Sequence, residues 1–535
     1  MVDNHQNLIV KKAQEECVGV VLMEKIDNEE KMMKVVRRVC RKYKVSCLDL
    51  KKVNLLETYK DLVARKKVAP DLSFENMMIK RRIRTESGVS VLSVMTKPLG
   101  CPGQCVYCPN QPLMPKSYLD NQPAAMRGVM NDFDPYDQVY SRLEMLKRMG
   151  HDVTKNEVIV LGGTFSAHPR GYQELFIKRV FDAVNSFGNK EPQIADNLAQ
   201  AKTINEKSVC RLIGLTVETR PDFISVDEIA WLRYLGVTRV ELGVQSVFDD
   251  VLQLVKRGHL VDETKRATGL LRQAGFKIVY HIMPGLPGAN QKKDEEMFQI
   301  LFADGGLMPD HLKIYPTVVL ENCEMYRWWQ NGQYEPYSEH EVEELLMKIK
   351  KNIPPWVRIV RLMRDIPESS IVAGVKSSNL RQKLAEKKVI CHCIRCREPK
   401  GKMIDEAVMM QIEYDTDWGK EYFLSFESKD KKNILALLRL FLPIVESEVW
   451  NELPCIKQAA IIREVHTYGQ VMGVDKQGNK IQHRGLGKKL MEQAEKVAQE
   501  NGFKKMAVIS GVGVREYYRK LGYRLEGEYM VKDLL

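Results

Sequence analysis

The feature that most constrains the fold of this chain is an alternation of short apolar runs with helical stretches between about Arg84 and Arg361. The runs are VSVLSVM, EVIVLGG, CRLIGLTVE, RVELGVQS, FKIVYHIM and DHLKIYP. Each run is apolar or β-branched enough for a strand that is buried on both faces, which is typical of parallel sheets covered by helices. We therefore expect an α/β fold, a parallel sheet or barrel, with its chemistry at the carboxyl ends of the strands.

Length and composition place the chain among folded proteins without a membrane segment. Its 535 residues allow about two to four domains, and the 44% hydrophobic and 28% charged content is ordinary globular usage. No long uncharged apolar stretch or signal-peptide core is present in the sequence. The 12 cysteines fall mainly in two tight clusters, which favours metal or cluster ligation in a reducing cytoplasm.

The N-terminal region, up to about Met78, has a helical pattern with a basic surface. Met32, Val35, Val36, Val39 and Tyr43 form one apolar face at helical spacing. Seven Lys or Arg and no acid lie between Lys31 and Lys44, and four more lie between Lys80 and Arg84. The net charge of +12 favours a polyanionic partner, but for the charge run taken alone a solvated helix face is the preferred interpretation.

A cysteine triplet, CxxxCxxC, follows the first predicted strand. Cys101, Cys105 and Cys108 lie in CPGQCVYCP. A 4Fe-4S cluster normally takes four cysteines, so three leave one iron open for a small molecule. Together with Tyr107 before the third cysteine, this pattern is typical of radical S-adenosylmethionine (SAM) enzymes. The alternatives are a zinc site with a distant fourth ligand and a purely structural set of cysteines.

Polar groups at the ends of later strands fit SAM binding in such enzymes. Gly162, Gly163 and Thr164 would let the backbone approach the methionine moiety, and Glu218 and Gln245 stand where strands could meet SAM or substrate. Each signal is weak alone, because a glycine pair at a strand end is often a plain turn.

A second cysteine cluster, CxCxxC, consists of Cys391, Cys393 and Cys396. Structural zinc takes four thiolate or imidazole ligands, and only three are local. We interpret the cluster as a zinc site that ties two domains together, with unliganded thiols or a second iron-sulfur cluster as alternatives.

The C-terminal part carries an acyl-CoA signature. The segment from Gln482 to Gly487, QHRGLG, matches (Q/R)xxGx(G/A), the turn that opens the central helix of GNAT acetyltransferases. Its backbone amides and the helix N-terminus favour pyrophosphate. A preceding strand would present the edge of Glu464 to Thr467 to the pantetheine arm, and Tyr517 and Tyr518 lie where a phenol could act as a general acid at the CoA sulfur.

Taken together, these residues resemble the catalytic-subunit family of Elongator in its archaeal or bacterial form. The similarity runs from about Lys80 to the end, through RTESGVSVLSVMTKP, CPGQCVYCPN, GLTVETRPD, TRVELGVQS, HIMPGLPG, VRLMRDIPESSIVAGV, REVHTYGQV, QHRGLGKKLMEQAE and ISGVGVREYYRKLGYRLEGEYM. It implies a radical SAM partial (β/α) barrel fused to a GNAT-type α/β acetyltransferase domain, with a basic helical N-terminal segment.

The resemblance also implies an activity, the carboxymethylation of carbon 5 of the wobble uridine in tRNA. In this family a 5'-deoxyadenosyl radical takes a hydrogen from the acetyl methyl of acetyl-CoA, the carbon radical adds to the uracil, and hydrolysis releases CoA. The family's acetyl-CoA contacts correspond here to Lys155, Glu464, Val465, His466, Thr467, Leu486, Gly487, Lys488 and Tyr518.

Four domains and several partners follow from this resemblance. We expect a tRNA-binding region over 1–80, the radical SAM core over 84–361, a linker with the second cysteine cluster over 362–400, and the GNAT domain over 401–535. The expected partners are the tRNA anticodon stem-loop, acetyl-CoA and an electron donor, with a homodimer or accessory subunits as further options and no membrane. The segment from Ala195 to Lys207 is predicted to be an exposed helix or loop insertion without an assigned function, and Lys116 stands where the family usually has Gln.

Two other functions compete with this one. A protein lysine acetyltransferase with a structural iron-sulfur cluster would explain the GNAT signature, and a tRNA-binding scaffold without catalysis would explain the basic N-terminus. The open-iron cysteine triplet speaks against the first, and the acyl-CoA signature against the second.

Overall fold

The computed structural model describes residues 2–79, 88–377, 379–399, 404, 406–468 and 485–534. Two compact units are present, Met1–Val91 with Tyr140–Lys155, and Leu92–Val139 with Asn156–Leu535. Within the described ranges, none of the helices combines the length and the apolar character that a membrane crossing needs. The basic residues Lys80 to Arg84 lie outside the described residues, as do Gln482, His483 and Arg484 of the acyl-CoA signature.

The first unit is built from helices around an apolar core. Its N-terminal helices are α1 (Val2–Met23), α2 (Glu29–Tyr43), α3 (Lys52–Ala64) and α4 (Leu72–Met78). Asn28 caps α2 by accepting a hydrogen bond from the Lys31 backbone amide, and Asp71 caps α4 in the same way. The predicted apolar face is confirmed, because its valines and Met32 are buried against α1 and α3.

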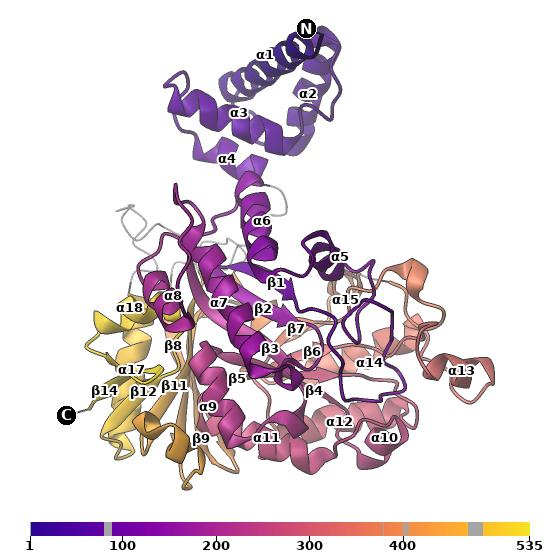
Figure 1. Cartoon of the computed structure of the whole chain (residues 1–535), viewed down its shortest axis with the longest axis vertical. Helices are drawn as coiled ribbons and strands as arrows, with labels where there is room; N and C mark the ends of the chain where they lie inside the picture. Colours follow the sequence, from indigo (N-terminus) through magenta and orange to yellow (C-terminus); the bar gives the residue numbers. More distant parts are fainter. Residues whose placement is uncertain are drawn as a thin grey trace. The chain divides into compact units, whose positions relative to one another are not determined.

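A seven-stranded sheet of order β1-β2-β3-β4-β5-β6-β7 forms the centre of the second unit. The pairings from β3 to β7 are parallel, and helices such as α7 and α11 pack against the sheet, so the predicted partial (β/α) barrel is confirmed (Figure 1). The strands are β1 (Ser90–Met95), β2 (Lys155–Leu161), β3 (Arg211–Thr219), β4 (Arg239–Gln245), β5 (Lys277–Ile282), β6 (His311–Ile314) and β7 (Arg358–Arg361).

Helices separate these strands, as the sequence predicted. They are α5 (Pro123–Met130), α6 (Pro135–Arg148), α7 (Arg170–Ser186), α8 (Leu198–Asn205), α9 (Val226–Leu235), α10 (Asp249–Leu254), α11 (Val261–Gln273), α12 (Gln291–Ala303), α13 (Met325–Gln330), α14 (Glu339–Asn352) and α15 (Leu380–Glu386). β7 was not predicted, because its sequence, RIVR, has only two apolar residues between two arginines.

The predicted exposure of the segment from Ala195 to Lys207 is wrong. The segment does contain a helix, α8, but Ala201, Lys202 and Asn205 on it are buried. Lys202 donates a hydrogen bond to the Tyr234 carbonyl and pairs with Glu528 of the C-terminal sheet. A lysine and an asparagine in a polar stretch look solvated in the sequence, and only the tertiary fold provides their buried partners.

A second seven-stranded sheet, of order β13-β14-β12-β11-β10-β9-β8, forms the GNAT-like part of the second unit (Figure 1, orange to yellow). Its strands are β8 (Ala407–Thr416), β9 (Gly419–Ser428), β10 (Ile434–Pro443), β11 (Ala460–Thr467), β12 (Lys505–Val508), β13 (Arg524–Glu526) and β14 (Tyr529–Asp533), and its helices are α16 (Val449–Glu452), α17 (Leu486–Glu500) and α18 (Arg515–Arg519). The last helix, α18, covers only the first part of REYYRKLGY, because it ends at Arg519 and two strands follow.

Candidate active site

The cysteine triplet lies in a loop that follows β1 and contacts the ends of later strands. Thr164 Oγ1 lies 3.4 Å from Cys101 Sγ, and Arg257 Nη1 donates to Cys105 Sγ at 3.5 Å. Gly103 lies between two of the thiols, because a Cβ built on it would stand 3.5 Å from Cys101 Sγ and 3.7 Å from Cys105 Sγ. The sulfurs of Cys101 and Cys105 therefore lie near each other, and both receive hydrogen bonds.

These residues fit a 4Fe-4S cluster. Hydrogen bonds to ligand sulfurs and a nearby positive charge stabilise the negative charge of a thiolate-bound cluster. Arg257 supplies such a charge from a buried position, where its Nε donates to the Gly243 carbonyl. The loop also packs closely against Arg220, because a Cβ on Gly103 would lie 2.5 Å from Arg220 Nη1.

The predicted SAM turn lies beside this loop. Gly162 has φ +139° and Gly163 has φ +93°, the left-handed region that favours glycine. A Cβ on Gly162 would lie 1.9 Å from Thr96 Oγ1, so no side chain fits there. The turn therefore presents bare backbone next to Thr164, whose hydroxyl contacts the cysteine loop.

Gln245 ends β4 with φ +72°, which is uncommon for a residue with a side chain. Its carbonyl accepts a hydrogen bond from the Met283 amide, while its side-chain oxygen is buried with no hydrogen-bond partner among the described residues. Such an unpartnered acceptor at a strand end is what a ligand site offers before its ligand arrives.

Glu218, also predicted to meet SAM, belongs to a charged cluster inside the half-barrel. Ligand atoms of Glu218, Glu241 and His281 lie within 4.8 Å of one another. Lys313 contacts the Glu241 carboxylate and lies 3.7 Å from Glu218, and Tyr118 donates to Glu218 at 2.7 Å. The Lys313 ammonium occupies the position that a cation would take, so the cluster is a buried ion-pair group.

The electrostatics of this cluster keep Glu241 ionised. Burial raises the pKa of Glu241, but Lys313 and a hydrogen bond from His281 at 2.8 Å hold that pKa far below its ordinary value. A cavity of about 50 Å³ lies near the same strand ends, lined in part by Tyr107, Met283, Tyr315 and Arg364. The carboxyl ends of the strands thus combine charge, a cavity and the cysteine loop.

Sequence reasoning did not single out Glu241, Lys313 and Arg257. A signal was present, since Glu241 and Lys313 each interrupt an apolar strand, and a charge in such a run is buried and needs a partner. The partner of each could not be read, because Glu241 and Lys313 lie 72 positions apart in the chain.

The second cysteine cluster is assembled as a compact triad. The sulfurs of Cys391, Cys393 and Cys396 all lie within 4.8 Å of one another. Tetrahedral zinc with Zn–S bonds of about 2.3 Å would place its sulfurs about 3.8 Å apart, so the triad fits zinc. Lys350 Nζ lies 3.6 Å from Cys396 Sγ, and His392 is exposed.

The predicted acyl-CoA strand, β11, has a free edge. It pairs in parallel with β12 only from Ala460 to Ile462, because β12 ends at Val508. Beyond that point the described chain pairs β11 with β10 alone, up to Thr467 opposite Ala436. The outer edge of Glu464 to Thr467 therefore lacks a strand partner among the described residues. This unpaired edge beside the end of β12, called the notch below, could add backbone hydrogen bonds to an extended group.

The helix that follows, α17, begins at this notch. Gly485 precedes it with φ +88°, and Leu486 and Gly487 form its first turn, whose free amides suit an anion. A Cβ on Gly487 would lie 3.1 Å from Tyr517 OH and 3.5 Å from Thr467 Cγ2. The structure thus brings Thr467, Gly487 and the Tyr517 phenol together, and Lys488 is exposed on the same turn.

The two predicted tyrosines have different surroundings. Tyr518 is only 6% exposed and packs in the core of the GNAT sheet, whereas Tyr517 is 38% exposed. Burial raises the pKa of both phenols. Tyr517 is therefore the phenol that stands open beside the α17 turn.

The remaining predicted acetyl-CoA residues have different surroundings. Val465 packs on the hydrophobic core beside α17. Glu464 is engaged by charged neighbours, and the His466 ring packs edge-on against Tyr468 with its centroid 4.4 Å away. Lys155 is the first residue of β2, and its part in acetyl-CoA binding stays a prediction.

Comparison with known families defines the class of this protein. The family models for the Radical SAM superfamily, the Radical_SAM C-terminal domain and the Acetyltransferase (GNAT) family match residues 95–301, 309–389 and 478–523, respectively. The chain is an enzyme of the acyltransferase class, with a radical SAM core, which implies a 4Fe-4S cluster and SAM, joined to a GNAT domain.

Curated relatives and a solved structure specify the family further. The tRNA uridine(34) acetyltransferase of Methanocaldococcus jannaschii is 43% identical over 85% of this chain and 86% of its own length. Elongator complex protein 3 of Homo sapiens is 39% identical, over 84% and 85%. The structure of the archaeal Methanocaldococcus infernus Elp3 with an N-terminal deletion matches at 40% identity and a TM-score of 0.72, over 84% of this chain and 99% of that one. The chain belongs to the Elongator complex protein 3 family.

Proposed function

We propose that this enzyme carboxymethylates carbon 5 of the wobble uridine in tRNA, with acetyl-CoA as the source of the carboxymethyl group. The observation that carries the proposal is that the cysteine loop and the acyl-CoA notch belong to one compact unit of the chain. Relatives that are named tRNA uridine(34) acetyltransferase support the same substrate.

The residues at the carboxyl ends of the barrel strands hold the radical-forming group. Cys101, Cys105 and Cys108 would hold the 4Fe-4S cluster, which with SAM and an electron donor would supply a 5'-deoxyadenosyl radical. The bare backbone of Gly162 and Gly163 admits the methionine part of SAM, with Thr164 beside it.

Glu218 and Gln245 would orient SAM from the ends of β3 and β4. Gln245 offers a buried amide oxygen that lacks a partner, and Glu218 is already held by Tyr118 and Lys313. The neighbouring cavity, with Tyr315 and Arg364 on its wall, would receive the uracil ring.

The GNAT notch holds acetyl-CoA. The first turn of α17, including Leu486, Gly487 and Lys488, would bind the pyrophosphate, and the free edge of β11 would pair with the pantetheine arm. Tyr517, with Tyr518 packed behind it, would place a phenol near the CoA sulfur, and Lys155 would contact the same molecule as in the family.

The N-terminal helical unit would grip tRNA through phosphate contacts. Lys31, Lys34, Arg38 and Lys42 on α2 pair with acids of α1, α2 or the turn between them, so the basic surface is smaller than the sequence indicates. Arg37, Arg41 and Lys44 are exposed and have no ion pair among the described residues. Such side chains bind a polyanion by displacing the counterions from its phosphates.

The domain boundaries and the second metal site complete the proposal. Residues 1–80 would bind tRNA, 84–361 carry the radical SAM core, 362–400 link the domains with zinc on Cys391, Cys393 and Cys396, and 401–535 form the GNAT domain. The cytoplasm, where thiols stay reduced, is the matching compartment.

The test is anaerobic reconstitution of the cluster, followed by assays of SAM cleavage and acetyl-CoA hydrolysis with and without tRNA. We expect tRNA to stimulate acetyl-CoA turnover, and a Cys105→Ala variant to lose SAM cleavage. If SAM stays intact and acetyl-CoA turns over only with a protein lysine acceptor, the enzyme is a lysine acetyltransferase with a structural cluster, and the proposal is wrong.

A further inference from the structure

The amino-terminal edge of the half-barrel holds the acyl-CoA strand. The strands β5, β6 and β7 begin with Lys277, His311 and Arg358, and parallel strands start at one common edge. Lys277 Nζ lies 3.4 Å from a Glu464 carboxylate oxygen, and His311 Nε2 lies 3.9 Å from the other. Arg358 donates to the hydroxyl of Tyr468, directly after β11, at 2.8 Å.

A β-bulge in β11 directs these side chains toward the barrel. Arg439 of β10 pairs with Glu464, but the next residue, Leu440, pairs with Ile462, so Arg463 is the extra residue. The bulge lies where β11 leaves β12, which is also where the free acyl-CoA edge begins. It lets the neighbours Arg463 and Glu464 both reach barrel residues.

Arg463 anchors the inner side of the bulge. It is fully buried and donates to Asp310 at 2.6 Å and to the Phe276 carbonyl at 2.7 Å. Burial raises the pKa of Asp310, but Arg463, Arg439 and Arg272 hold it at about 2. This aspartate of the barrel is therefore ionised between arginines, two of which come from the GNAT sheet.

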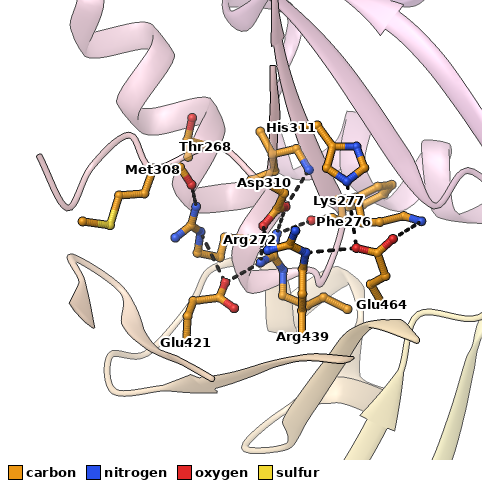
Figure 2. A network of polar contacts seen from close by, with 12 residues as sticks. Thr268, Arg272, Phe276, Lys277, Met308, Asp310, His311, Glu421, Arg439 and Glu464 are labelled. Carbon is orange, nitrogen blue, oxygen red and sulfur yellow. Dashed lines mark hydrogen bonds and ion pairs between the residues drawn. The ribbon is translucent and has the colours of Figure 1, made fainter. Parts of the chain in front are cut away.

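Glu464 anchors the outer side of the bulge. Figure 2 shows its carboxylate between Arg439, Lys277 and His311, with Arg439 Nε at 3.0 Å. Burial raises the pKa of Glu464, but Lys277 and Arg439 hold it well below its usual range. The carboxylate is thus committed to neighbours, two of them from the barrel.

After the bulge, the side chains of β11 alternate between two faces of the strand, and the two faces contact different parts of the protein. Glu464 and His466 point to one face, while Val465 and Thr467 point to the other, toward α17. Side chains on the barrel face therefore fix the strand, and its backbone edge and Thr467 face the notch.

Strand β6, which begins with His311, also contributes Lys313 to the charged cluster of Glu218, Glu241 and His281. His311 and Lys313 are two residues apart on the four-residue strand β6 and share one face. His311 contacts Glu464, and Lys313 contacts Glu241 and Glu218. One short strand thus fixes the spacing between the acyl-CoA strand and the cluster that faces the cysteine loop.

We propose that Lys277 is a positioning residue for acyl-CoA. It holds the Glu464 carboxylate and thereby fixes the unpaired edge of β11 against the barrel, so that CoA affinity depends on a residue of the radical SAM core. This inference rests on the proposed function, because it takes the β11 notch as the acetyl-CoA site.

The test measures CoA affinity of the full-length, cluster-loaded enzyme by isothermal titration calorimetry. We expect Lys277→Met to weaken CoA binding about tenfold. The matched control is Lys202→Met, which removes another barrel-side lysine that pairs with a GNAT glutamate, Glu528, away from β11. The control should leave CoA affinity within about twofold of wild type.

A double-mutant cycle tests whether Lys277 affects CoA binding through Glu464. In a Glu464→Gln background, Lys277→Met should cause little further loss, because the lysine acts through the carboxylate. Lys277→Arg, which keeps a cation near Glu464, should restore most of the affinity. Lys277→Gln provides a milder variant if Lys277→Met does not fold, as judged by its melting curve.

Two results would overturn the inference. One is wild-type CoA affinity in both Lys277→Met and Lys277→Gln. The other is an equal loss in the Glu464→Gln background, which would mean that Lys277 contacts CoA itself. Failure of the wild-type enzyme to bind CoA would instead overturn the proposed function, so the two failures are distinguishable.

Discussion

The two ends of the half-barrel both carry buried charge and use it differently. At the carboxyl ends, Lys313 pairs with Glu241 near a cavity, and the side-chain oxygen of Gln245 has no hydrogen-bond partner within the described part of the chain. At the amino ends, Asp310 of the barrel pairs with Arg463 of the GNAT sheet, and Lys277 of the barrel pairs with Glu464 of the GNAT sheet. The comparison teaches that buried ion pairs lie beside the proposed ligand site at one end and join two domains at the other.

Cys105→Ala should have the largest effect, confined to the carboxyl end. Loss of one of three ligands should prevent a stable cluster and abolish SAM cleavage, measured by chromatography of 5'-deoxyadenosine together with iron content. CoA affinity should stay near wild type. Cys47→Ala, on an exposed cysteine of the N-terminal unit, is the control and should retain full iron content.

Asp310→Ala should act on the amino end and on stability. It removes the buried carboxylate that Arg463 and Arg439 share and leaves them only Glu421 and Glu464 as partners, and removing one member of a buried ion pair costs about 3–5 kcal/mol. Denaturant unfolding followed by circular dichroism measures the loss. Asp250→Ala, which removes an exposed pair with Lys293, should cost less than about 0.5 kcal/mol. An equal loss of unfolding free energy in Asp310→Ala and Asp250→Ala would contradict the role of Asp310 as a buried charge partner.

Glu228→Gln sharpens the comparison with a buried carboxyl that lacks a close cation. Its nearest basic group, Arg170, lies 3.9 Å away, and burial raises the pKa of Glu228 to about 7. The folded state therefore loses stability relative to the unfolded chain as pH rises from about 4.5 to 7.

Glu228→Gln removes that cost, so it should stabilise the protein by about 1 kcal/mol at pH 8 and not at pH 4.5. Melting curves at the two pH values measure the gain. The exposed neighbour change, Asp227→Asn, should give no such pH dependence. A gain of the same size at both pH values would mean that packing, not ionisation, is responsible.

Tyr517→Phe should have the smallest effect. The hydroxyl stands beside the first turn of α17, so its loss should weaken CoA binding about threefold, the net value of one hydrogen bond. Tyr518→Phe, on the phenol buried behind it, is the matched change and should alter CoA affinity less. The reverse order would assign the ligand contact to Tyr518.

The sequence was sufficient for the features with a local pattern. The strand-helix alternation predicted the half-barrel, and the spacing of Cys101, Cys105 and Cys108 predicted one sulfur-lined loop. The apolar face from Met32 to Val39 predicted a buried side of α2. Each of these depends on residues a few positions apart.

Features that depend on distant partners escaped prediction. β10 was not predicted, because ILALLRLFLP is rich in leucine and lacks the alternation of a half-exposed strand. It lies in the middle of its sheet, buried on both faces. The bulge at Arg463 and the ion pair of Glu464 with Lys277 depend on register and tertiary contact, which no local pattern specifies.

The most direct test of the central claim is the fate of the acetyl methyl carbon. Cluster-loaded enzyme would be incubated with SAM, a reductant, tRNA and acetyl-CoA labelled with ¹³C at the methyl group, and the tRNA nucleosides would be analysed by mass spectrometry. The account predicts the label in a carboxymethyl group on carbon 5 of the wobble uridine. Unmodified uridine with intact SAM, or label on protein lysines alone, would contradict it.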